Sequence, residues 1–445
     1  MIVRALGALT AALLVAVALA PGASAAPRRA GPPLLAGAAA LEVSLPAGTP
    51  LAGYGGFPRR ALLPDIFGRF PHAFWFRPST GVHDPLRARS LVLEAGAMRV
   101  LWLAVDLVGI DPGLATALAG RLRQHGLAYS AIIVSASHTH SGPGAYADSA
   151  LFAFIAIDRL SPMVRERIVD GLVRAARAAE AGKVAARVGP GRAEVHGITD
   201  SRVQGPLDPE LGVVRVTDLR GRPVALLWNY AIHGTALGRE NSLLSGDLMA
   251  EASARIEREL GVPALFINGA VGDVSPRPRG WTGVEEAGRA LAAGALAAWG
   301  AAKPEVDPRL DVVIERVTLP SPALSLRNCL GGWIPGSVTL GLARALPSSG
   351  GLIALAIGET AWVTIPGELE TGLGLDVKAA AREHFPHVLV AGVSNDYLGY
   401  FLSPSHYRRP SYIGCGSLYG ERGGEIIRDG AIAALRRLGA RKGRR

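Results

Sequence analysis

The sequence predicts an α/β protein in which helices cover a large mixed β-sheet. Two observations support this class. Short apolar runs alternate with segments that have helical patterns, and polar residues gather where the apolar runs end. With 445 residues, of which 49% are hydrophobic, the chain can bury a substantial core. Since the sequence contains no internal repeat and no low-complexity linker between domains, we expect one large domain.

The N-terminal residues have the layout of a secretory signal peptide. A single basic residue precedes an apolar stretch over residues 5–20, and small residues ending in Ala-Ser-Ala follow. This pattern predicts cleavage after Ala25 and a secreted or periplasmic protein. An uncleaved anchor is the alternative, which is disfavoured because the apolar stretch is short for a bilayer span. Residues 26–40 are expected to form a Pro/Gly/Ala linker, and the folded domain is expected over residues 41–445.

Charge and cysteine content narrow the classes of function. The formal charge is +10, but the basic residues are scattered except in the tail over residues 436–445, which favours a solvated end or a weak contact with anionic lipid. We therefore expect no nucleic-acid partner, and nothing implies a protein partner. The two cysteines, Cys329 and Cys415, have no zinc-finger spacing, and the sequence does not decide whether they form a disulfide.

The individual elements follow from the local patterns. Apolar runs, several of them continuous enough for burial on both faces, predict strands over residues 90–95, 99–110, 129–137, 210–218, 223–234, 263–273, 352–367 and 387–397. Helical patterns predict helices over residues 112–126, 161–182, 246–261, 283–302, 371–385 and 424–439.

The polar residues at the ends of the predicted strands indicate where a site should lie. In open α/β sheets, ligands bind beyond the carboxyl ends of the strands. Six side chains repeat this placement: Asp106, His138, His233, Asn268, Glu368 and Asn395.

The segment over residues 57–86 does not fit the alternation of strands and helices. It carries many aromatic residues among prolines and arginines. We expect either a long surface loop packed by its own side chains or an apolar lip beside the active site.

Three histidines and a glutamate are candidates for a metal site. An extended backbone places His138 and His140 on one side of a strand, roughly 6.5 to 7 Å apart, so both can serve one site. His233 also follows a predicted strand, and zinc favours imidazole combined with a carboxylate, which Glu368 could supply. Taken alone, His233 could instead be a core histidine, and Glu368 could cap the helix that follows it.

The stretch Asn-Gly-Ala-Val-Gly-Asp-Val-Ser-Pro places Ser275 after small residues that permit a tight turn. A serine nucleophile usually has a base within hydrogen-bond reach. The Gly-x-Ser-x-Gly elbow of α/β-hydrolases is absent here, which weakens a simple triad and favours metal assistance.

Five motifs in this order resemble the neutral, non-lysosomal ceramidase family, zinc-dependent amidases that cleave the N-acyl bond of ceramide. The motifs are HTHSGPG, NYAIHGT followed by SGD, NGAVGDVSP, IPGE and SNDYLGYFLSPSHYRRPSYIG. Together with LAGYGG near residue 51, they cover most of the chain up to about residue 420. Each motif is weak alone, whereas the five in order are specific.

The resemblance implies one zinc ion per chain and assigns roles residue by residue. The metal ligands would be His138, His233, Glu368 and Tyr400, with Tyr397 as the alternative to Tyr400. The residues facing the substrate would be His140, Ser275, Tyr412, Arg202 and the backbone at Gly53.

The implied reaction is hydrolysis of the linear amide bond of ceramide or a related N-acyl lipid. Zinc would polarise the carbonyl and lower the pKa of its water, while His140 and Tyr412 would stabilise the oxyanion or steer the leaving amine. Ser275 would be either a nucleophile or a hydrogen-bonding partner. The alternatives are a zinc hydrolase for another ester or N-acyl substrate, and a non-catalytic lipid-binding relative. The sequence departs from the family pattern because it ends soon after the tyrosine-rich motif, so we expect a single catalytic domain without the family's C-terminal immunoglobulin-like domain. The aromatic segment and the basic tail suggest peripheral contact with a membrane surface.

Overall fold

The computed structural model describes residues 33–305 and 308–441. The expected signal peptide over residues 1–25 lies outside the described residues, as do the first seven residues of the expected linker and the last four of the basic tail. Among the described residues, no helix is both long enough and apolar enough to cross a membrane.

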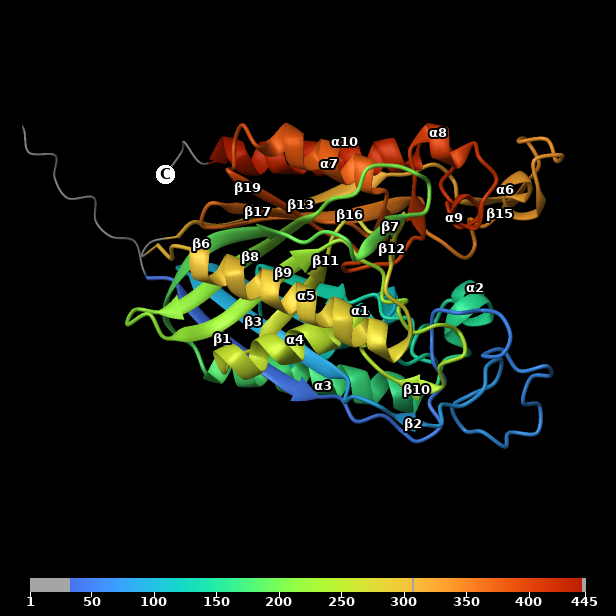
Figure 1. Ribbon diagram of the computed structural model, residues 1–445, viewed down its shortest axis with the longest axis horizontal. Coiled ribbons are helices and arrows are strands. Elements are labelled where there is room, and N and C mark those ends of the chain that lie inside the picture. The colour runs from blue at the N-terminus through green and yellow to red at the C-terminus, as the bar shows by residue number, and fades with distance from the viewer. Residues whose placement is uncertain (1–32, 306–307, 442–445) are drawn as a thin grey trace, which may run out of the picture. The chain divides into compact units, whose positions relative to one another are not determined.

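An eight-stranded mixed sheet forms the centre of the protein (Figure 1). β4–β5 and β9–β11, the outermost pairs at the two edges, are parallel, and the other neighbours are antiparallel. In spatial order the strands are β11 (Ala264–Asn268), β9 (Pro223–Tyr230), β8 (Glu210–Asp218), β6 (Val184–Glu194), β1 (Leu35–Glu42), β3 (Arg87–Ala95), β4 (Met98–Val105) and β5 (Ala131–Ala136).

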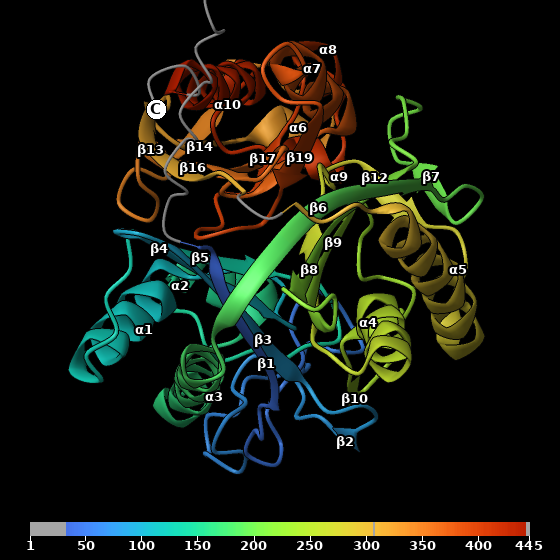
Figure 2. The ribbon, with the colours of Figure 1, turned by 90° about the vertical axis from the view of Figure 1, so that its left-hand side faces the viewer.

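A second sheet packs against the first and gives a layered α/β/β/α arrangement (Figure 2). Its strands, in order, are β13 (Leu310–Thr318), β16 (Ser349–Ile357), β17 (Thr360–Thr364) and β19 (His387–Ala391). Side chains from both sheets, among them Trp102 and Trp362, share one apolar core. The mixed α/β class with a large sheet, predicted from the sequence, is confirmed.

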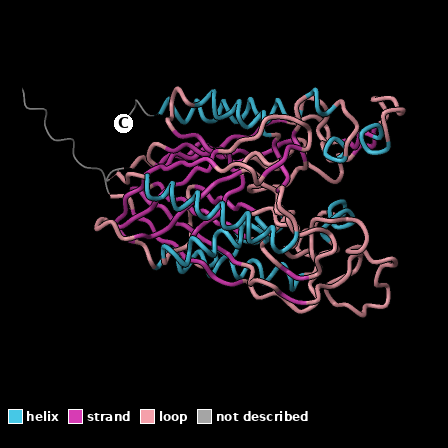
Figure 3. Tube along the Cα trace, viewed as in Figure 1, coloured by secondary structure: helices cyan, strands magenta, loops and turns pink. Residues whose placement is uncertain are grey.

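Helices cover the two outer faces. The eight-stranded sheet is covered by α1 (Pro112–Gln124), α3 (Pro162–Ala181), α4 (Asp247–Leu260) and α5 (Gly280–Ala301). The second sheet is covered by α7 (Thr371–Ala381) and α10 (Gly423–Ala440). All six predicted helices are present within a few residues of the expected bounds. Loops gather at the end of the molecule opposite the chain's C-terminus (Figure 3).

The predicted linker over residues 26–40 is wrong for its described part. Residues 35–42 form β1, an interior strand that pairs with β3 along its whole length. Gly37 approaches α3 so closely that a Cβ atom would lie 2.1 Å from the Ala179 carbonyl oxygen. The pattern hid this strand because alanine and glycine have low strand propensity and supply no apolar alternation.

The run over residues 352–367, predicted as one strand, is a hairpin. β16 and β17 pair antiparallel around a tight turn in which Gly358 has a φ of +60°. The sequence predicts one strand here because β16 and β17 are buried on both faces, so the apolar run continues across the turn. Glycine adopts this backbone conformation without a steric penalty, which allows so short a connection.

The two cysteines, whose pairing the sequence left open, form a disulfide. It joins α6 (Leu326–Leu330) to the short helix α9 (Tyr412–Cys415). Next to this bond, the Asn328 side chain donates hydrogen bonds to the carbonyls of Tyr407 and Gly414. α6 and the strand that follows it are therefore tied to the segment that carries Tyr412.

The close approach of β1 to α3 yields a stability test. Gly37→Ala is expected to lower the free energy of unfolding by about 1 to 3 kcal/mol, because the added methyl must displace backbone atoms of α3. The matched control is Gly351→Ala, a strand glycine whose Cβ would meet nothing within 4 Å. Denaturant unfolding of both variants measures the difference, and equal stabilities would contradict the placement of β1 in the core.

Candidate active site

Two histidine-bearing segments meet beyond the ends of β5 and β9. His138 follows β5 and His233 follows β9, and the two backbones bond to each other. The Gly234 N–H donates to the His138 carbonyl at 3.2 Å, and the His140 N–H donates to the Gly234 carbonyl at 2.8 Å. A Cβ atom at Gly234 would lie 2.6 Å from the Cα of Thr139, so glycine is required for this approach.

Backbone carbonyls fix the orientation of two imidazole rings. His138 Nδ1 lies 2.5 Å from the Val108 carbonyl, and His233 Nδ1 lies 2.7 Å from the Val274 carbonyl. Because a carbonyl only accepts, each Nδ1 carries a hydrogen, which makes Nε2 the nitrogen that a neutral ring offers as a ligand. This is the arrangement in which protein histidines bind metals through Nε2.

Both Nε2 atoms point at one buried carboxylate. Glu368, in β18 (Glu368–Leu369), places Oε1 3.3 Å from His138 Nε2 and Oε2 2.9 Å from His233 Nε2. Within the described chain, His138 Nε2 and Glu368 Oε2 have no hydrogen-bond partner. Burial, followed by the charge of Arg202, lowers the pKa of His233 to about 3, so this ring is neutral. Two imidazole nitrogens that converge on one buried carboxylate form a donor set that fits a divalent metal.

His140 lies beside this pair but is held differently. One nitrogen from each of His138, His140 and His233 can be chosen so that the three atoms lie within 4.8 Å of one another. Neither ring nitrogen of His140 has a partner among the described residues. Burial, with His138 next in effect, holds the pKa of His140 well below its usual value of 6.5. The ring is thus neutral, free to donate or accept, and less constrained than the other two.

Gly53 and Tyr54 hold the other side of His140. Gly53 has a φ of +98°, and a Cβ atom there would lie 2.6 Å from the His140 ring. The Tyr54 ring packs edge-on to His140 at 5.0 Å between centroids. The sequence singled out Gly53 in the LAGYGG motif but not its neighbour Tyr54, which the same motif could have revealed.

Two tyrosines lie against Glu368. The Tyr397 hydroxyl donates to Glu368 Oε1 at 2.5 Å, and Tyr400, in β20 (Tyr400–Phe401), stands opposite Glu368 in the parallel pair β18–β20. Burial, with Glu368 next in effect, raises the pKa of Tyr397 well above 10.0, and the same two causes raise the pKa of Tyr400. Both phenols are therefore protonated next to this carboxylate, and the geometry brings both to the site.

Arg202 connects the metal-binding candidates to Ser275 and Tyr412. Its Nε donates to Ser275 Oγ at 2.7 Å, and its Nη1 lies 3.1 Å from His233 Nε2. The guanidinium also stacks over the Tyr412 ring at 5.6 Å from the centroid. Ser275 thus receives a hydrogen bond from a cation, and no base is bonded to its hydroxyl among the described residues.

Part of this set lines a cavity of about 430 Å³, whereas His138, His233 and Ser275 are not among its lining residues. The polar groups His140, Arg202, Glu368, Tyr397 and Tyr400 share its wall with an apolar set. The apolar lining comprises Val108, Leu151, Phe152, Ile155, Ala156, Ile157, Leu324 and Leu418. The sequence did not predict the lining residues between 151 and 157. They lie in α2 (Ala150–Phe152) and in the following π-helix η1 (Ala153–Ile157). A mostly apolar pocket with a few polar groups at one end suits a lipid-like ligand.

Three of the six polar residues at strand ends support the site without facing it. Asn268 bridges the two histidine segments, because its Nδ2 donates to the carbonyls of Ser137 at 3.0 Å and Ile232 at 2.9 Å. Asn395 bonds to the backbone of β5 at Val134, and Asp106 accepts from the backbone N–H of Arg87. The rule for strand ends therefore selects residues that the fold brings near one another, but it does not separate candidate ligands from scaffold residues.

Comparisons with known proteins agree on one family. The family described as neutral/alkaline non-lysosomal ceramidase, N-terminal, matches residues 73–290. The neutral ceramidase of Mycobacterium tuberculosis is 27% identical over 234 residues, which are 45% of this chain and 36% of that protein. The neutral ceramidase of Pseudomonas aeruginosa is 26% identical over 220 residues, covering 44% of this chain and 33% of that protein. These alignments span about a third of each relative's length.

The fold is shared more widely than the sequence. The crystal structure of neutral ceramidase from Pseudomonas aeruginosa matches with a TM-score of 0.79 at 20% identity, covering 92% of this chain and 75% of that one. A structure titled "Ceramidase complexed with C2" matches with the same TM-score and covers 76% of its chain. At this identity the match establishes the fold.

The bridging role of Asn268 can be tested directly. Asn268→Ala is expected to lower the free energy of unfolding by about 2 to 4 kcal/mol, since the buried Ser137 and Ile232 carbonyls lose their donor. It should also weaken metal binding about tenfold by loosening the two histidine segments. Gln124→Ala, which truncates an exposed amide on α1, is the control. Unchanged stability and metal affinity in Asn268→Ala would contradict the bridge.

Proposed function

The family match, the related sequences and the shared fold support the assignment of this chain to the neutral/alkaline non-lysosomal ceramidase family, and on that premise we propose that it is a metal-dependent amidohydrolase. Its substrate would be ceramide or a related N-acyl lipid, which is cleaved to a sphingoid base or amine and a fatty acid. The observation that carries this proposal is the pair of carbonyl-anchored histidines whose Nε2 atoms face the buried Glu368.

The proposed metal ligands are His138, His233, Glu368 and Tyr400, holding one zinc ion. When bound, zinc supplies Lewis acidity, which polarises a carbonyl and makes a nearby water more acidic. His138 and His233 suit this task because a carbonyl orients each ring, whereas neither nitrogen of His140 is anchored. His140 is therefore assigned to the substrate.

The remaining groups would bind and orient the substrate. Ser275 accepts from Arg202 and keeps its own hydrogen free to donate, which favours a hydrogen-bonding role with the headgroup over a nucleophilic one. Arg202 is held between Ser275 and Tyr412, so its charge can stabilise a developing oxyanion. Tyr412 lines the cavity and is 62% exposed, which supports its assignment to the leaving amine. Gly53 lets the backbone close over His140.

Secretion through the N-terminal 25 residues belongs to the same proposal, since the pattern there is typical of a cleaved signal peptide. The lipid substrate further suggests contact with a membrane surface. The segment over residues 57–86 supports this, because it exposes aromatic side chains.

The reaction and its metal can be tested together. We expect the purified protein to contain one zinc per chain and to release fatty acid from long-chain ceramide. His138→Ala should lose the metal and at least about 100-fold of the activity, because one of four ligands is gone. The control is His125→Ala, an exposed histidine at the end of α1.

Each contrary outcome removes a different part of this proposal. A wild type that hydrolyses ceramide without metal would remove zinc from the mechanism. Cleavage of esters alone would indicate another substrate, and a zinc-loaded protein that cleaves no N-acyl lipid or ester would indicate a lipid-binding relative.

The two tyrosines beside Glu368 give a second test. With cobalt in place of zinc, Tyr400→Phe is expected to change the visible spectrum and weaken metal binding about 10- to 100-fold, because a ligand is lost. Tyr397→Phe should keep the spectrum, since it removes only the hydrogen bond to Glu368. The reverse pattern would make Tyr397 the ligand.

A further inference from the structure

Residues 57–70, which we call the first lobe, present a cluster of large apolar side chains to solvent. Leu62 is 83% exposed, Leu63 80%, Ile66 70% and Phe67 81%. Single exposed apolar residues are common, but four within six positions form a patch that calls for a partner. The base of the lobe is ordered by buried polar groups, because Arg59 bonds to the Ala52 carbonyl and Asp65 accepts from the Phe70 N–H. These four exposed side chains, the apolar tips of the lobe, therefore lie on a loop whose base is held in place.

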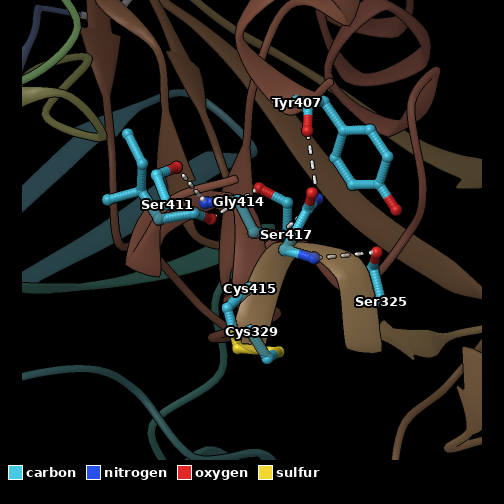
Figure 4. Close-up of a disulfide and its surroundings, with 9 residues drawn as sticks. Ser325, Cys329, Tyr407, Ser411, Gly414, Cys415 and Ser417 are labelled. Atoms are coloured by element: carbon cyan, nitrogen blue, oxygen red, sulfur yellow. Dashed lines mark hydrogen bonds between the residues drawn. A yellow bond between two sulfur atoms is a disulfide. The ribbon is translucent and has the colours of Figure 1, made fainter. Parts of the chain in front are cut away.

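Residues 326–344, the second lobe, repeat this design. They comprise α6, β15 (Thr339–Gly341) and the turn between them, and they expose Leu330, Val338, Leu340 and Trp333, the last at 81%. The disulfide from Cys329 to Cys415 fixes this lobe to α9 (Figure 4). Tryptophan is favoured where an apolar environment meets water.

The two lobes flank the mouth of the cavity. Both lie at the right-hand end of the molecule in Figure 1, with α2 between them. The first lobe is joined to the cavity wall through Arg60, which bonds to the Gly55 and Phe154 carbonyls. Phe154 and Ile155 of η1 are exposed next to this contact, and Ile155 lines the cavity. The second lobe adjoins the opposite wall, where Leu324, Tyr412 and Cys415 are lining residues.

Both lobes contain more basic than acidic residues. The only acidic residue in the first lobe, Asp65, is buried and pairs with Arg69, whose side chain is 68% exposed. The second lobe contains Arg327 and Arg344 and no acidic residue. A second copy of this chain would bring like charges together, whereas an anionic lipid surface would attract them.

We propose that the two lobes dock the protein on an anionic lipid bilayer, with the apolar tips inserted between headgroups and the cavity mouth facing the lipid. Only one part of this inference rests on the proposed function, namely that the cavity mouth faces the lipid because the substrate is a lipid. Exposed apolar side chains on loops that also carry arginines match the layered chemistry of a bilayer surface, where acyl chains lie beneath charged headgroups.

Docking can be measured by sedimentation of the full-length protein with lipid vesicles that contain no substrate. We expect binding to vesicles of phosphatidylcholine mixed with phosphatidylglycerol, weaker binding to phosphatidylcholine alone, and weaker binding at high salt. The double variants Leu63→Ser/Phe67→Ser and Trp333→Ser/Leu340→Ser should each lower partitioning at least about tenfold, since each removes two inserted apolar side chains. Leu219→Ser/Ile314→Ser, which changes two exposed apolar residues outside the lobes, should not.

The lobe variants should keep the wild-type thermal transition and their hydrolysis of a short-chain ceramide in detergent micelles, while losing activity on ceramide embedded in vesicles. Wild type that fails to bind either vesicle, or lobe variants that bind as well as wild type, would overturn the proposal. So would a dimer in solution that the lobe substitutions dissociate. A protein that binds vesicles but cleaves no N-acyl lipid would contradict the proposed function and would still support the docking surface.

Discussion

The buried carboxylate of Glu368 is the constraint on which the site depends. A charged carboxylate is costly to bury unless a cation or several donors compensate it. Here one donor is Tyr397, and two imidazoles approach with Nε2, because the carbonyls of Val108 and Val274 bind Nδ1 on the opposite side of each ring. Together these groups form a donor set that fits a divalent metal. The fold thus brings together groups that are suited to hold a metal ion.

That arrangement requires the two sheets to be placed accurately. His138 and His233 leave different parallel pairs at opposite edges of the large sheet, while Glu368 follows a strand of the second sheet. Their segments are joined by main-chain contacts, by Asn268, and by Gly392, whose N–H donates to the Asn268 carbonyl at 2.8 Å. Packing in the shared core around Trp102 and Trp362 therefore sets the positions of the metal-binding candidates.

Much of this organisation could be predicted from the sequence, and what could not has physical reasons. Amphipathic helices and buried strands carry local patterns, so the α/β class and all six helices followed from them. β1 and β6 were missed because alanine, glycine and proline give a strand no recognisable alternation, and only neighbouring strands specify it. The polar residues at strand ends located the site, but a ligand and a scaffold residue such as Asn268 look alike until their hydrogen bonds are known.

The position of the apolar lobes follows from the same topology. Chemistry that lies beyond the carboxyl ends of strands needs its walls and entrance built from the connecting loops at that end. Lengthening such loops costs little stability, because loop-closure entropy grows only slowly with length. Residues 57–70 and 326–344 are connecting segments of this kind, each tied to the cavity wall, one through Arg60 and the other through the Cys329–Cys415 disulfide. The fold can thus change how substrate reaches the cavity without moving the groups that surround Glu368.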